Sequence, residues 1–140
     1  MDQKLFILTA NGTMGLSGSA VVDNAPDPGL FILRSTGTGH INYGDQVTLH
    51  IGLLSVEVDP ATSRLRTVVL HPVHPGHPGP STSVFTLKPI PGHVVAPFTN
   101  GSEFALLTDY GCLRCRNGYV QAGGAVDTDA PARLKGKFQP

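Results

Sequence analysis

The histidines of one proline-rich tract have a spacing that suits metal binding. His71, His74 and His77 recur at every third position. A polyproline-II segment has three residues per turn, so these imidazoles would line one edge and offer ligands to zinc, copper or nickel. The alternative is a solvated loop. We favour the loop, because the tract contains no Cys, Asp or Glu to complete a coordination shell, and we expect no cofactor.

A second group of candidate residues lies between positions 109 and 117, where an aromatic ring, a carboxylate, two cations and an amide occur close together. Sugar recognition uses an aromatic face for the apolar side of the ring and fixed polar groups for the hydroxyls. We therefore hypothesise a ligand-binding pocket formed by Asp109, Tyr110, Arg114, Arg116 and Asn117. The alternative interpretation makes the arginines solvated surface residues and Tyr119 part of the core.

The sequence contains no motif of a known catalytic site. It lacks a G-x-S-x-G elbow, an H-E-x-x-H helix, a P-loop and a Rossmann glycine pattern. Its close carboxylate pairs, Glu57/Asp59 and Asp127/Asp129, are expected in or beside turns, where Asp usually bonds to its own backbone. We therefore expect a non-enzymatic protein.

Cysteine occurs only as the pair Cys112 and Cys115. A lone C-x-x-C supplies half of a zinc ribbon's ligands. On a strand, residues three apart point to opposite faces, so a disulfide between them would distort the backbone. We expect two reduced thiols, at least one of them buried, which fits a reducing compartment.

Composition limits both the fold and the partners. The chain has 140 residues, enough for one domain, and its 10 basic residues offset its 10 acidic ones. A neutral chain has no bulk positive field, so we expect neither nucleic acid nor an anionic membrane as a partner. The sequence has no apolar run near the ~20 residues that span a bilayer and no signal peptide at its start, which predicts a cytoplasmic protein without membrane insertion.

Short alternating segments predict strands throughout the chain. Val47-Thr48-Leu49 and Phe85-Thr86-Leu87 are examples of apolar residues at period two. Asn-Gly pairs at 11–12, 100–101 and 117–118 mark tight turns, because both residue types tolerate positive φ. With 17 Gly and 12 Pro, the composition favours turns over helices, and we expect an all-β fold.

Three related segments divide the chain into units of about 1–38, 39–91 and 92–140. Each unit contains a G-x-apolar-x-apolar hairpin, beginning at Gly12, Gly52 and Gly111. Each also contains a closing strand that ends in a cation, although the third copy, Ala132 to Lys137, matches less cleanly. His40 and His93 lie at equivalent positions at the start of the second and third units, which favours a shared structural role in closing a barrel.

Three units of about four strands around one core describe a β-trefoil. The hairpin glycines, the G-D-Q-V-T-L opening at 44–49 and the F-x-L closing strand at 85–87 resemble fascin-like and hisactophilin-like β-trefoils across the whole chain. The ricin-type Q-x-W motif is absent, since the chain has no Trp. We therefore expect a single β-trefoil domain over residues 1–140, and the structural alternative is a small β-sandwich.

The resemblance implies binding through loops or shallow pockets on a rigid barrel. We expect lectin-like glycan recognition by the residues between 109 and 117, in a monomer or weak dimer. The alternative partner is a protein, bound through the rigid Pro-rich loop 71–80 in the manner of a protease inhibitor or a fascin-like cytoskeletal binder.

Overall fold

The structure is all-β. It is a computed structural model that describes residues 2–35, 39–69, 81–90, 97–125 and 132–140. Within these ranges the one helical element is the short 3-10 turn η1 (Ser81–Ser83), as the glycine- and proline-rich composition predicts. No helix of the described residues has the length and hydrophobicity needed to cross a membrane.

Twelve strands make up the described part of the fold, four in each segment that the repeat pattern defines. The first segment contains β1 (Asp2–Leu8), β2 (Gly15–Ser17), β3 (Ala20–Val22) and β4 (Phe31–Ser35). The second contains β5 (Gln46–Ile51), β6 (Leu54–Val58), β7 (Leu65–Val69) and β8 (Val84–Pro89). The third contains β9 (Glu103–Thr108), β10 (Gly111–Arg116), β11 (Tyr119–Gly124) and β12 (Leu134–Phe138).

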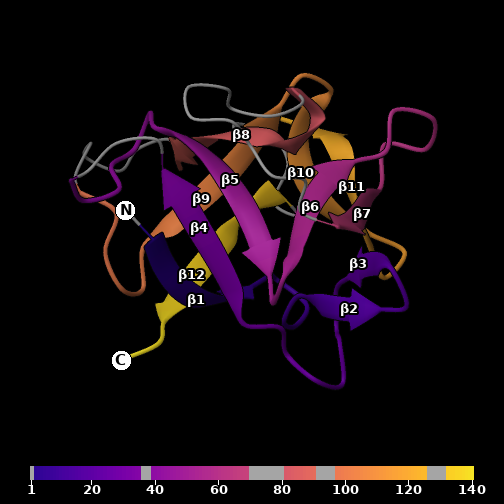
Figure 1. The fold of residues 1–140 in the computed structure, drawn as a ribbon, viewed down its shortest axis with the longest axis horizontal. Helices are drawn as coiled ribbons and strands as arrows, with labels where there is room; N and C mark the ends of the chain where they lie inside the picture. Colours follow the sequence, from indigo (N-terminus) through magenta and orange to yellow (C-terminus); the bar gives the residue numbers. More distant parts are fainter. Residues whose placement is uncertain (1, 36–38, 70–80, 91–96, 126–131) are drawn as a thin grey trace.

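The strands form one antiparallel sheet that folds back on itself, with sandwich-like layers on either side of the core (Figure 1). Six strands pair in a closed ring, in the order β1, β4, β5, β8, β9, β12 and back to β1. The other six form the hairpins β2–β3, β6–β7 and β10–β11. The hairpins meet one another through β3, which pairs with both β7 and β11.

Alternation along the ring strands directs one set of side chains into the ring. In β1, Leu5 and Ile7 point into the ring and are fully buried, whereas Lys4 points away from the ring and is exposed. The same pattern recurs in the first strand of each later segment and in the strands that close each segment. In the first strands, β5 and β9, the buried inward residues are Val47, Leu49, Phe104 and Leu106. In the closing strands, β4, β8 and β12, they are Phe31, Leu33, Phe85, Leu87 and Leu134.

The predicted Asn-Gly turn at 117–118 is confirmed. Arg116 pairs with Tyr119, which leaves a two-residue loop. Asn117 has a φ of 54° and Gly118 a φ of 81°. Positive φ at both central positions matches the right-handed twist of the flanking strands, which is why Asn and Gly stand here.

Both faces of β6 are buried. Ser55 and Glu57 are buried like Val56 and Val58, although polar residues that alternate with apolar ones on a strand usually face solvent. The 3-10 turn η1 packs on that outer face, and Thr82 Oγ1 donates to Glu57 Oε2 at 3.4 Å. Glu57 is therefore a buried strand residue, whereas Asp59 lies in the turn after β6 and its Oδ1 accepts the Ala61 backbone N–H at 3.0 Å, as expected. Asp127 and Asp129 lie outside the described residues.

Candidate functional site

The residues predicted to form a pocket lie along the whole length of β10. Asp109 and Tyr110 occupy the turn before this strand, and Arg116 and Asn117 are at its far end. Six residues of extended chain separate these ends by roughly 17 Å. Arg114 is half-buried in the middle of the strand. The two ends of the predicted group therefore do not come together around one small ligand.

The tyrosines of this region are surface residues. Tyr110 is 43% exposed and Tyr119 is 38% exposed. The Arg64 guanidinium lies 4.2 Å from the centroid of the Tyr119 ring, a cation–π geometry that covers one face. The interpretation of Tyr119 as a core residue is therefore wrong, and Arg64 already occupies a face that a sugar would use.

The metal hypothesis falls on His71, His74 and His77, which lie outside the described residues, as does loop 71–80. In the part of the chain that the structure describes, no three His, Cys, Asp or Glu side chains form a group that could hold a metal ion. Both cysteines are free and buried, as expected. Burial, and then the nearby Asp23 carboxylate, raise the pKa of Cys115 to about 12, so its thiol is neutral and unreactive at ordinary pH.

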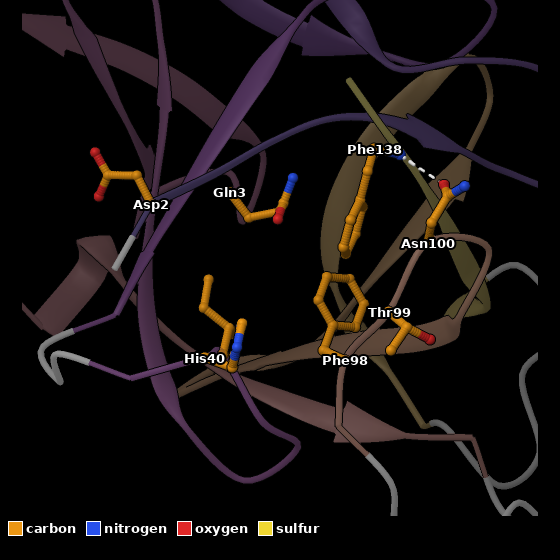
Figure 2. A pocket seen from close by; sticks show the side chains of 8 residues that line it. Asp2, Gln3, His40, Phe98, Thr99, Asn100 and Phe138 are labelled. Atoms are coloured by element: carbon orange, nitrogen blue, oxygen red, sulfur yellow. Dashed lines mark hydrogen bonds between the residues drawn. The ribbon is translucent and has the colours of Figure 1, made fainter. Parts of the chain in front are cut away.

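A pocket of about 260 Å³ opens at the end of the ring opposite the hairpins, beside the first residues of β1 and the last residue of β12 (Figure 2). Phe98 and Phe138 form one side of it, and the Gln3 carboxamide lies across the space from these rings. The complete lining is Asp2, Gln3, His40, Ile41, Phe98, Thr99, Asn100 and Phe138.

The aromatic side of the pocket exists because the third closing strand differs from the other two. Where β4 has Leu33 and β8 has Leu87, β12 has Gly136. A Cβ on Gly136 would lie 3.2 Å from Phe98 Cζ and 3.0 Å from a methyl carbon of Leu5. The missing side chain thus leaves room for the Phe98 ring, which the chain supplies from the segment before β9.

Phe98 is held by other aromatic side chains. Its ring meets Phe104 edge to face at a centroid distance of 5.1 Å and lies 5.3 Å from Phe138. Tyr43 contacts it from a third side at 6.0 Å, and the Tyr43 hydroxyl donates to the Glu103 carbonyl. Burial raises the pKa of Tyr43, so this hydroxyl remains a donor. The ring is therefore a fixed surface rather than a mobile side chain.

Polar groups complete the pocket. Asn100 Oδ1 accepts the Phe138 backbone N–H at 2.9 Å, which ties the pocket wall to the end of β12 (Figure 2). Gln3 donates through Nε2 to the Lys4 carbonyl at 3.0 Å, leaving its Oε1 as an acceptor. His40 is exposed at the rim, and its structural role in closing a barrel stays a prediction because His93 lies outside the described residues.

The Asp2 carboxylate at the rim of the pocket is already in an ion pair with Arg34. It accepts two bonds from the Arg34 guanidinium, at 2.9 and 3.0 Å. These bonds lower the pKa of Asp2, so it remains ionised at neutral pH. Sequence reasoning missed this pocket, although one feature pointed to it: the imperfect third copy of the closing strand, where glycine replaces leucine.

No protein-family model matches the chain, and no curated protein is similar to it. Functional inference therefore depends on the geometry and chemistry of the pocket.

Proposed function

We propose that the chain is a single β-trefoil that acts as a non-enzymatic, lectin-like module for a small glycan. The order of pairing supports the trefoil: a ring strand, a hairpin and a second ring strand follow one another three times. The closed ring favours this fold over a sandwich of two separate sheets. The units 1–38, 39–91 and 92–140 would then be its three repeats, as the resemblance to fascin-like and hisactophilin-like trefoils implies.

The observation that carries the functional proposal is the pocket at the open end of the ring. Its volume of about 260 Å³ is just below the ~300–1,000 Å³ of sites for drug-sized ligands. That size suits one small ring rather than an extended chain. The pocket also combines the two surfaces that a sugar requires, aromatic carbon on one side and amide and imidazole groups on the other.

Rigidity supports binding at this place. Phe98 is fixed by aromatic neighbours, and the Phe138 backbone is fixed by Asn100. A ligand that enters a preformed pocket loses less free energy to ordering side chains. The Asp2 carboxylate at the rim is ionised and bonded to Arg34, so it is a poor proton donor.

The test is a glycan array followed by calorimetry on variants that leave the packing intact. We expect the double variant Gln3→Ala/His40→Ala to lose binding, because both side chains face the pocket and neither belongs to the core. The matched control is Tyr110→Ala/Arg116→Ala, which removes the site first predicted from sequence. If only the control variant lost glycan binding, the glycan site would lie at β10 instead of the pocket. An array without any binding would remove the lectin proposal.

The protein-binding alternative is tested with the same samples. If the pocket is the glycan site, deletion of residues 71–80 should leave glycan binding unchanged, because the described residues that line the pocket belong to other parts of the chain. A deletion that abolished every interaction of the protein would instead favour recognition through that loop.

A further inference from the structure

The outer face of β1 and β12 carries a cluster of lysines. The two strands lie side by side (Figure 1), with Phe6 opposite Lys137 and Leu8 opposite Lys135. The Gln139 backbone N–H donates to the Lys4 carbonyl, which extends the pairing of the two strands past the pair Leu5–Phe138. Outward side chains on these strands therefore place Lys4, Lys135 and Lys137 around the Phe6 ring.

Register fixes the approximate spacing of these charges. Lys135 and Lys137 are two residues apart on one strand, about 6.6 Å along the backbone. Lys4 lies diagonally across from Lys137, at about 7–8 Å. Lys4 is offset from Lys135 by four residues along the paired strands, about 14 Å, so the three charges form an elongated row with Lys137 in the middle and the Phe6 ring beside Lys137.

Two carboxylates border these lysines, and one of them, Asp2, is already paired with Arg34. All three lysines are exposed, and within the described ranges the ion pairs are made by Arg34 and Arg66 instead. Glu103 stands opposite Lys135, on the edge of the cluster away from Lys4. The chain is neutral as a whole, but charges separated by more than a Debye length of ~10 Å are largely screened from one another. Overall neutrality therefore does not prevent a local positive surface.

We propose that this lysine cluster binds an anionic polysaccharide chain. Charge complementarity selects an anion, and the Phe6 ring offers a stacking surface for the apolar face of a sugar. The proposal is separate from the pocket, because none of Lys4, Lys135 and Lys137 lines it.

The topology argues against other anionic partners. An acidic peptide could not add as a strand, because β1 is paired on both sides with β4 and β12, and β12 with β1 and β9. A membrane surface would need a protruding apolar side chain beside the cations, whereas Phe6 is half-buried. Duplex nucleic acid is held by many phosphate contacts, more than three lysines provide.

The probe is dextran sulfate, with neutral dextran as the backbone control. We expect the protein to bind immobilised dextran sulfate at ~50 mM NaCl, to dissociate as salt rises, and to ignore neutral dextran. In Lys4→Gln/Lys137→Gln the affinity should fall about tenfold or more, with a weaker dependence on salt. Lys137→Arg keeps the charge and should keep the binding.

The matched control removes two positive charges elsewhere. Lys88→Gln/Arg64→Gln changes residues of β8 and the β6–β7 connection, and should retain wild-type affinity. Equal losses in both double variants would overturn the proposal, as would equal binding to neutral dextran or tighter binding to a single-stranded oligonucleotide. Gln3→Ala/His40→Ala should still bind dextran sulfate, so failure of the pocket and failure of the lysine cluster are distinguishable.

Discussion

A double-mutant cycle between Phe98 and Gly136 tests the packing that creates the pocket. If the absent side chain of Gly136 makes room for the Phe98 ring, then the two positions are energetically coupled. Gly136→Ala would place a Cβ 3.2 Å from Phe98 Cζ and 3.0 Å from Leu5 Cδ1, closer than ordinary carbon contacts. Removing the ring relieves the first of these contacts and gives Leu5 space to move away from the second.

The expected free energies follow from burial and contact. Phe98 is 6% exposed, so Phe98→Ala should lower the free energy of unfolding by about 3–5 kcal/mol. Gly136→Ala alone overpacks the ring and should cost about 1–3 kcal/mol. The double variant should be more stable than the sum of the single effects predicts, with a coupling free energy of about 1 kcal/mol.

Urea unfolding followed by far-UV circular dichroism and tyrosine fluorescence measures each corner of the cycle. With m-values of about 1–3 kcal/mol/M, a coupling of this size displaces the midpoint by about 0.3–1 M. Gly39→Ala is the control, since no atom lies within 4 Å of its added Cβ, and its effect should add to that of Phe98→Ala. Additivity of Gly136→Ala within about 0.3 kcal/mol would refute the packing argument.

Three further predictions concern titratable groups. Burial, and then the Arg34 charge, lower the pKa of His50 below 6.5. As the pH falls, His50 is therefore protonated in the unfolded chain before it is protonated in the folded chain. Wild-type stability should therefore fall as pH drops below about 6.5, and His50→Gln should lose less over that window; parallel pH curves would contradict this. The Asp2–Arg34 pair is 45–48% exposed, so Asp2→Asn should cost less than about 1 kcal/mol at pH 7. Because the pKa of Asp2 is lowered from 3.8, wild type and variant should converge as pH falls through and below that value. Ellman's reagent at about pH 8 should label Cys112 and Cys115 only after unfolding, and rapid labelling of the native protein would refute their inert burial.

Features set by neighbouring residues were predictable from sequence. Period-two alternation predicts strands such as β5 and β8, and the Asn117-Gly118 turn requires only the φ preferences of two residues. The outer face of β6 is different. Glu57 is buried because η1, more than 20 residues later in the chain, packs over it. Burial of that kind depends on tertiary contacts that a local pattern does not contain.

Candidate site residues were harder to predict, for a geometric reason. A group of polar residues close in sequence, such as 109–117, spreads out when the chain between them is extended. The pocket instead combines residues that are far apart in sequence. Gln3 and Phe138 meet because β1 pairs with β12, and His40 lies near Phe98 because the Phe98 backbone N–H donates to the Ile41 carbonyl. Ring closure, rather than sequence proximity, decides which side chains share a surface.

The three closing strands β4, β8 and β12 differ at one inward position. Leu33 and Leu87 fill the ring at two closing strands, and a leucine at position 136 would fill it at the third. Glycine there creates a space that the chain fills with Phe98, a larger residue from outside the ring strands. The same ring forms one wall of the pocket. The glycine in the third closing strand and the aromatic wall of the pocket therefore have one physical origin, the space that the absent side chain of Gly136 leaves for Phe98.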